Sequence, residues 1–144
     1  MIILAIDPGT VASAYVLWDT KKTEILDKCI IENSLILTFI HSINFDLLAI
    51  EMIASYGMPV GKEVFETCLW IGRFIQVADS RGVQFIKLLR KDVKSFLCGS
   101  MKAKDSNIRQ ALIDLLGKDK TKGVSKDMWS ALAIAVLGEK TWTE

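Results

Sequence analysis

Apolar residues lie along this chain in runs whose patterns predict a sheet covered by helices. Residues 3–7 and 46–51 contain apolar runs that end on a carboxylate, as expected of strands buried on both faces. Residues 13–19 and 23–31 are rich in aromatic and β-branched residues, which predicts an antiparallel meander with the first strand. Residues 83–89 predict a fifth strand.

The segments between and after these strands predict helices, because their apolar residues recur at helical spacing between capping signals. They are residues 35–43, 61–81, 90–97, 107–116 and 126–137. Asn33 or Ser34 is expected to cap the first helix, and Gly138 to end the last. A crossover helix before residue 46 sets the fourth strand parallel to the first. The predicted fold class is α/β: a five-stranded mixed sheet, three antiparallel strands plus two parallel, flanked by helices in one domain over residues 1–144.

The helix predicted over residues 61–81 has more apolar positions than one packing face needs. One interpretation is that the same helix of a second subunit packs against it. The other is that the helix is buried more deeply within a single chain. The sequence alone leaves both open.

Three carboxylates are expected to meet at one edge of the sheet. Asp7 and Glu51 end the two strands predicted to be parallel, and the ends of parallel strands share an edge. Asp127 begins the last helix, whose small apolar residues predict close packing on the sheet. Clustered carboxylates either take up a proton or bind a cation. Ligands that are all oxygen favour Mg²⁺, with Mn²⁺ as a substitute, and two such ions suit phosphodiester hydrolysis.

The formal net charge of +1 conceals a segregated distribution. Residues 82–126 carry 11 basic and four acidic side chains, whereas the rest of the chain is acidic. Such a block is typical of phosphate binding, although a solvated face has the same composition. No apolar run reaches membrane-spanning length and no signal-peptide pattern opens the chain, so we expect a cytoplasmic protein.

Three motifs resemble one known family. They are Ile6-Asp7-Pro8-Gly9-Thr10, Ile50-Glu51 and the run from Asp127 to Ala135. With the order of strands and helices, they resemble the RuvC family of Holliday junction resolvases, within the RNase H-like nucleases, and especially the compact RuvC-like proteins of bacteriophages. The similarity runs from Met1 to Gly138. It implies a homodimeric, Mg²⁺-dependent endonuclease that nicks two opposed strands of four-way or branched DNA, in a bacterial or phage-infected cell. The apolar surplus of the 61–81 helix then makes that helix the expected dimer contact.

The resemblance also assigns residues. Asp7, Glu51 and Asp127 match the acidic metal-binding positions, and Lys94 matches a basic position with a catalytic or phosphate-binding role. The expected contacts to nucleic acid are Arg90, Lys91, Lys94, Lys102, Lys104 and Arg109.

One departure from the family concerns the second metal ion. Family members carry another acid one helical turn after the first on the last helix, where this chain has Ser130. Ser130 could hold an ion through water, Glu63 or Glu66 could compensate, or the second ion could bind weakly.

Other functions stay open. A related RNase H-like nuclease that processes RNA precursors is the nearest rival, and a catalytically weak module that binds DNA junctions is another. An actin-like ATPase also begins with a strand and an Asp-x-Gly-Thr motif, but those enzymes resemble two such domains in tandem, and 144 residues hold only one.

Overall fold

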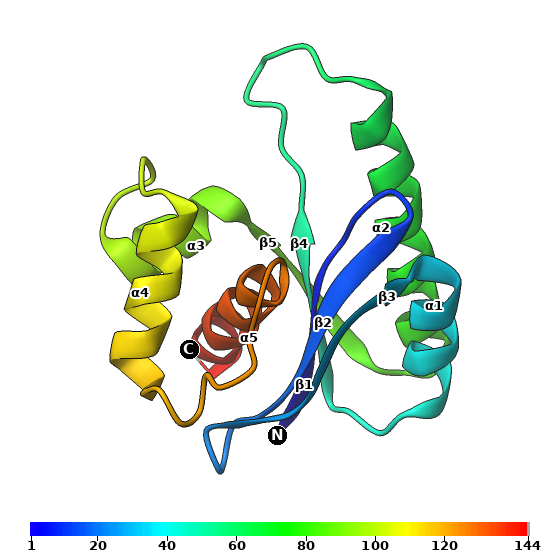
Figure 1. Cartoon of the computed structure of the whole chain (residues 1–144). Helices are drawn as coiled ribbons and strands as arrows, with labels where there is room; N and C mark the ends of the chain where they lie inside the picture. The colour runs from blue at the N-terminus through cyan, green and yellow to red at the C-terminus, as the bar shows by residue number, and fades with distance from the viewer. Residues whose placement is uncertain (144) are drawn as a thin grey trace.

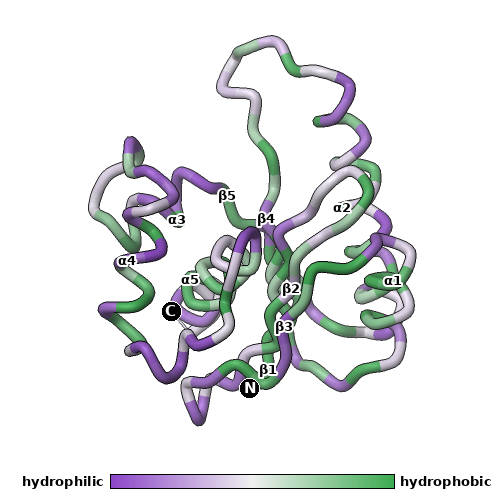
Figure 2. Tube along the Cα trace, in the orientation of Figure 1, coloured by the Kyte–Doolittle hydropathy of each residue, from purple (hydrophilic) through white to green (hydrophobic). Residues whose placement is uncertain are grey.

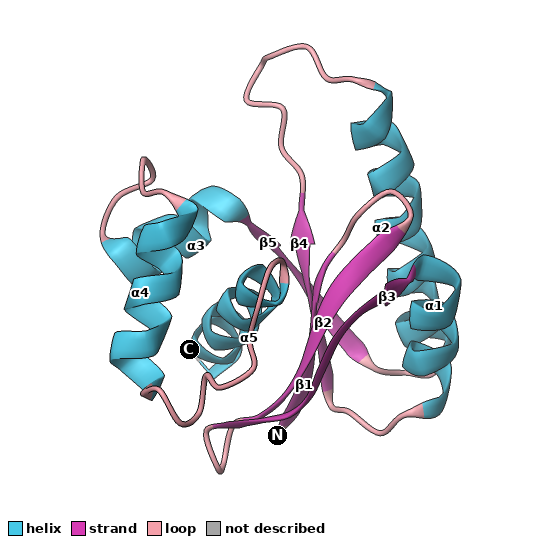
Figure 3. Cartoon of the chain, in the orientation of Figure 1, coloured by secondary structure: helices cyan, strands magenta, loops and turns pink. Residues whose placement is uncertain are grey.

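The computed structural model, which describes residues 1–143, has a five-stranded mixed sheet flanked by helices (Figure 1, Figure 3). The strands are β1 (Ile2–Asp7), β2 (Ala12–Asp19), β3 (Glu24–Glu32), β4 (Leu47–Met52) and β5 (Gln84–Leu89). The helices are α1 (Asn33–Ser42), α2 (Lys62–Ser80), α3 (Arg90–Cys98), α4 (Asp105–Leu116) and α5 (Met128–Thr143). The strand order β3-β2-β1-β4-β5 confirms the predicted fold class. None of the helices in residues 1–143 is long and apolar enough to cross a membrane.

β1 is the central strand and sets the geometry of the sheet edge. It pairs antiparallel with β2 and parallel with β4, in a register that places Ile6 beside Ile50. Asp7 and Glu51 each follow that pair by one residue. The two carboxylates therefore leave the sheet at the same level of the same edge.

Side chains of β1 and β4 alternate between two cores, one on each face of the sheet. Leu4 and Ile6 enter the core formed with α1 and α2, whereas Ile3 and Ala5 enter the core formed with α5. β4 alternates in the same way. Because strand side chains alternate with a period of two, Asp7 continues the series that faces α5. Glu51 does the same on β4.

The two faces of the sheet are covered differently. α1 and α2 cover one face, and α5 lies on the other with α3 and α4 outside it (Figure 1). Figure 2 shows the strands and α5 as mainly hydrophobic, and the turn after β2 and the connection from α4 to α5 as mainly hydrophilic. Residues 82–126, the basic block of the sequence, form β5, α3, α4 and most of the connection to α5.

Gly138 does not end the last helix, so that prediction is wrong. α5 continues to Thr143, and Gly138 is fully inside the packed part of the helix. A Cβ atom at this position would lie 3.0 Å from the Cβ of Ala49. The glycine therefore lets α5 pack close against β4. The gain from this close packing outweighs the low helix propensity of glycine.

α2 divides into a buried and an exposed part. Ile71, Phe74 and Ala78 are buried under the sheet, whereas Phe65 and Leu69 are 62% and 70% exposed. The apolar residues of the C-terminal half are thus buried within a single chain, as the second interpretation of the sequence expects. The N-terminal half projects beyond the sheet (Figure 1) and keeps an unpartnered apolar stripe.

Candidate functional site

Asp7 and Glu51 share a hydrogen bond at the end of the central strands. Burial, followed by the negative charges of Glu51 and Asp127, raises the pKa of Asp7 from 3.8 to about 8. Burial also raises the pKa of Glu51, although Arg90 opposes that rise. The contact between the two carboxyl groups raises the pKa of Asp7 and lowers that of Glu51. The pair carries negative charge that the protein compensates only in part.

A buried polar network fixes the turn that follows Asp7. The side chain of Asn33 donates to the carbonyl of Gly9 (2.9 Å) and accepts from the hydroxyl of Ser13 (2.5 Å). Ser13 in turn accepts from the backbone N–H of Gly9 (3.1 Å). A side chain at Gly9 would place its Cβ 2.3 Å from the carbonyl oxygen of Ala12. The turn after Asp7 therefore depends on glycine and on an asparagine from α1.

This network corrects the expected helix cap. Glu32 occupies the N-cap position of α1, and no side chain caps the helix. Asn33 is 1% exposed and serves the Gly9 turn instead. Asn-Ser before an apolar run is a local signal for a helix cap. Here the Asn33 side chain instead forms hydrogen bonds with Gly9 and Ser13, which are distant in the sequence.

The third predicted carboxylate, Asp127, lies directly before the first residue of α5 and is exposed. Its backbone carbonyl accepts the N–H of Ala131 (3.1 Å), so it begins the helix. Its charge contributes to the raised pKa of Asp7. Ser130 lies one turn further along α5.

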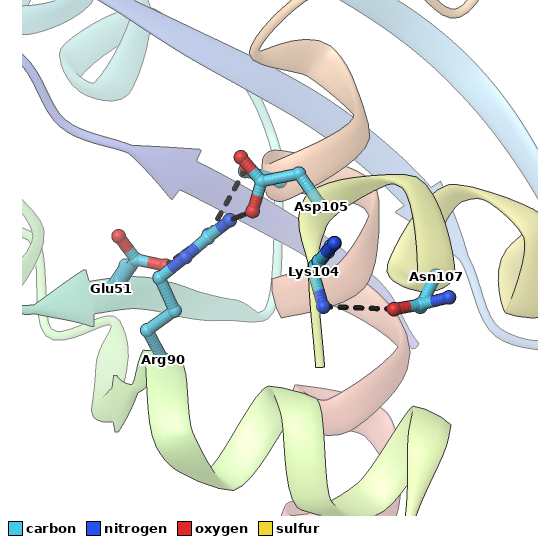
Figure 4. Close-up of polar contacts among 6 residues, drawn as sticks. Glu51, Arg90, Lys104, Asp105 and Asn107 are labelled. Atoms are coloured by element: carbon cyan, nitrogen blue, oxygen red, sulfur yellow. Dashed lines mark hydrogen bonds and ion pairs between the residues drawn. The ribbon is translucent and has the colours of Figure 1, made fainter. Parts of the chain in front are cut away.

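Arg90 contacts residues of three other elements inside the acidic cluster, two of which are labelled in Figure 4. It is the first residue of α3, and its Nη1 lies 3.5 Å from Glu51 Oε1 and 3.4 Å from Ser130 Oγ. Its Nη2 forms an ion pair with Asp105, the first residue of α4. The sequence placed Arg90 among the contacts to nucleic acid, whereas its partners in the structure are these acids and Ser130.

Asp105 was missed as a site residue. In the sequence it stands just before the helix predicted over residues 107–116, a position typical of a helix cap and not of a site residue. Lys104 instead occupies the N-cap position of α4, with its backbone N–H donating to Asn107 Oδ1 (2.9 Å; Figure 4). No sequence signal links Asp105 to Arg90, because the packing of α4 beside α3 creates the contact.

The carboxylate oxygens of the site suit Mg²⁺ or Mn²⁺, but they do not form a complete coordination sphere. In residues 1–143, no group of three or more His, Cys, Asp or Glu side chains is placed to hold an ion. Mg²⁺ commonly binds through one or two carboxylates and takes its remaining ligands from water and substrate phosphate. The Asp7–Glu51 pair fits that mode.

Two hollows flank Arg90. The inner pocket, of about 280 Å³, is lined by residues that include Arg90, Asp105, Arg109, Lys126, Asp127 and Ser130. The outer hollow, of about 430 Å³, is lined by Tyr56, Arg90, Lys91, Lys94 and Met101. In the outer hollow, Lys91 Nζ lies 5.5 Å from the centre of the Tyr56 ring. Four of the six predicted basic residues, Arg90, Lys91, Lys94 and Arg109, thus line one or both of these hollows.

The remaining predicted residues lie elsewhere. Lys102 lines a separate hollow between α3 and α4, and Lys104 is exposed at the start of α4. Glu63 and Glu66 are on α2, which packs on the opposite face of the sheet from α5, and Glu66 pairs with Lys62 (3.6 Å). The structure does not bring these two glutamates to the carboxylate pair.

The sheet order, the helices on each face and the carboxylates at the edge define an RNase H-like fold. Thermus thermophilus RuvC has this fold: its structure matches with a TM-score of 0.74 and 18% identity, over 94% of this chain and 92% of that chain. The same TM-score and identity relate this chain to T. thermophilus RuvC in complex with a Holliday junction substrate, over 94% and 91% of the two chains. The yeast mitochondrial Holliday junction resolvase Ydc2 matches with a TM-score of 0.57 and 12% identity, over 94% and 74%. No protein-family model and no curated protein sequence matches the chain. The likeness to RuvC inferred from the sequence is thus confirmed for the fold.

Proposed function

We propose that this chain is a metal-dependent endonuclease that resolves Holliday junctions, or other branched DNA, by paired nicks. The observation that carries the proposal is the Asp7–Glu51 pair, held at the end of the central strands of a RuvC fold with incompletely compensated charge. One matching RuvC structure holds a Holliday junction substrate, and Ydc2 is described as a resolvase. These neighbours support branched DNA as the substrate class.

Asp7, Glu51 and Asp127 are the residues that would hold Mg²⁺, or Mn²⁺ in its place. A bound ion would supply a Lewis acid and a more acidic water. In the hydrolysis, a water oxygen bonds to phosphorus and the bond from phosphorus to the 3′ oxygen breaks. The water releases a proton to solvent, and the 3′ oxygen gains one. Lys94, which lines the outer hollow beside Arg90, would hold an oxygen of the phosphate under attack.

Basic residues around the two hollows would contact the DNA backbone. The candidates are Lys91, Lys94, Lys102, Lys104, Arg109 and, from the structure, Lys126. Contacts to phosphate position a duplex without reading its sequence, and each releases bound counterions. Binding is therefore expected to weaken steeply with salt and to depend on the shape of the DNA.

Paired nicks require two sites, and the exposed half of α2 is the proposed contact between two copies. Phe65 and Leu69 lie four residues apart, on one helical stripe, and both are largely exposed. Packing the same stripe of a second copy against them would form a two-fold symmetric interface.

The test compares an end-labelled four-way junction with a linear duplex and an RNA hairpin, each with Mg²⁺. Wild-type protein should nick opposed strands of the junction and leave the linear duplex largely intact. Asp7→Asn should abolish nicking, whereas Asp79→Asn, an exposed acid on α2, should not. Equal cutting of junction and duplex would reject junction selectivity, and preferential cutting of the RNA would favour a role in RNA processing.

A second function, a module that binds junctions without cutting them, is favoured by one observation. Arg90 occupies one oxygen of Glu51, and Ser130 offers no charge in place of an acid. This alternative predicts junction binding with no nicking at any Mg²⁺ or Mn²⁺ concentration. The same nicking gel, run beside an assay of junction binding by the metal-free protein, separates this module from the endonuclease. Binding without nicking would favour the module.

A further inference from the structure

The start of α5 offers the site a carboxylate just before the helix and a hydroxyl in its first turn, and an arginine lies against the hydroxyl. Asp127 and Ser130 are three residues apart and so lie on one side of the helix. Ser130 Oγ accepts a hydrogen bond from Arg90 Nη1 (3.4 Å). The same nitrogen lies 3.5 Å from Glu51 Oε1. The space beside Glu51 and Ser130 is therefore occupied by a guanidinium group.

Arg90 is held in this position from two sides. Its other terminal nitrogen pairs with Asp105, which is 82% exposed, whereas the side chains of Arg90 and Glu51 are 33% and 14% exposed. A guanidinium stays protonated at every working pH, and its planar fork matches two oxygens of a phosphate. Arg90 also lines both the inner pocket and the outer hollow. A DNA strand that passes between the two would bring its phosphate to this group.

Charge balance around Arg90 favours a single metal ion. Asp7, Glu51, Asp105 and Asp127 carry four negative charges when ionised, and Arg90, Arg109 and Lys126, which line the inner pocket, carry three positive charges. The protein thus leaves about one negative charge at the site, which a single divalent ion more than balances. A second ion would have to bind beside the Arg90 guanidinium, which lies 3.5 Å from Glu51 Oε1. Two positive groups that close repel each other strongly where bulk water is excluded.

We propose that Arg90 supplies the positive charge that a second metal ion supplies in two-ion nucleases, so that this site takes one divalent ion. The inference rests on the endonuclease function proposed above. The sequence predicted two ions, and the pairing of Arg90 with Glu51 and Ser130 is the reason for the change. During hydrolysis Arg90 would stabilise negative charge on the phosphate and on the departing 3′ oxygen, with no proton transferred from the guanidinium.

The experiment counts metal ions with Mn²⁺ as the probe, by titration calorimetry and by the electron paramagnetic resonance signal of bound Mn²⁺. The wild-type chain should bind one ion, and Asp7→Asn should bind none. The double variant Arg90→Gln/Ser130→Asp should bind two and show the signal of a coupled pair. Arg73→Gln, an arginine stacked on Trp70 away from the site, serves as the matched control and should bind Mn²⁺ as the wild type does.

Single variants of Arg90 separate a role in cleavage from a role in folding. Arg90→Gln should bind one Mn²⁺ at least as tightly as the wild type, because a competing cation has left Glu51. It should nick the junction about 100-fold more slowly or worse, the scale of loss when one preorganised charge partner is removed. Arg90→Lys, which keeps the charge without the fork, should bind one ion and nick at an intermediate rate.

Several results would overturn the proposal: two Mn²⁺ ions on the wild-type chain, none at all, or weaker Mn²⁺ binding by Arg90→Gln. The ion count needs no DNA, so its failure is distinct from failure of the endonuclease function. A chain that binds one ion and nicks nothing would refute the endonuclease, and with it the role of Arg90 in cleavage. Two bound ions in an active enzyme would refute the role of Arg90 alone.

Discussion

Replacing Asp7 with Asn should stabilise the metal-free protein, and more so as the pH rises. The pKa of Asp7 is raised from 3.8 to about 8 by burial and by the charges of Glu51 and Asp127. Between these two values the folded chain binds a proton at Asp7 that the unfolded chain has lost. The free energy of unfolding therefore falls with rising pH across this window, by up to about 1.4 kcal/mol per pH unit.

The asparagine side chain resembles the protonated acid, because it is neutral and its amide can donate to Glu51. The variant should lack this one-proton dependence. Relative to Asp7→Asn, the wild type should lose about 3–4 kcal/mol between pH 5 and pH 8, which is three pH units at nearly the full slope. Above pH 8 the difference should level off, since Asp7 is then ionised in both states.

The assay is urea unfolding followed by tryptophan fluorescence at pH 5, 6, 7 and 8, with EDTA to keep the protein free of metal. Asp79→Asn, an exposed acid on α2, is the matched control, and its offset from the wild type should not change with pH. A gap between Asp7→Asn and the wild type that stays constant from pH 5 to pH 8 would refute the reasoning. It would mean that Asp7 is not the site of the extra proton.

Three further predictions concern the packing around the site and the subunit contact. Asn33→Ala should lower the free energy of unfolding by about 1–3 kcal/mol in urea, because it leaves buried hydrogen-bonding groups without partners; an unchanged midpoint would contradict the network. Gly138→Val should lower it by about 1–3 kcal/mol through overpacking against β4, and a thermal melt equal to that of the wild type would show that α5 can move away from the sheet. Phe65→Ser with Leu69→Ser should convert a dimer to a monomer in sedimentation without lowering the unfolding midpoint, whereas a wild-type chain that sediments as a monomer would reject the interface.

Much of the fold follows from local pattern. The buried runs of β1 and β4 and the length of chain between them are enough to predict two parallel strands with Asp7 and Glu51 at one edge. Alternation along a strand then determines which face each side chain meets, because the period is fixed by backbone geometry. The convergence of these two acids could therefore be expected from the sequence.

The remaining features come from tertiary packing that local rules do not encode. Arg90 and Asp105 are partners because α3 and α4 pack side by side, and neither residue has a spacing that marks it. Asn33 and Gly138 carry signals for a helix start and a helix end, yet each was used for a contact between distant segments. In both cases a buried partner outweighed a local preference of about 1 kcal/mol.

The polar network around Asn33 has a consequence for motion at the candidate site. The backbone N–H groups of Gly9 and Asn33 are both hydrogen-bonded, the first to Ser13 Oγ and the second to the carbonyl of Val11 (2.9 Å). Breaking either bond exposes polar groups held between the sheet and α1, so local fraying is costly. These two amides should exchange with deuterium only when the whole domain opens. Such slow exchange would place the Asp7 turn in the most cooperative unit of the molecule, although it is drawn as a loop.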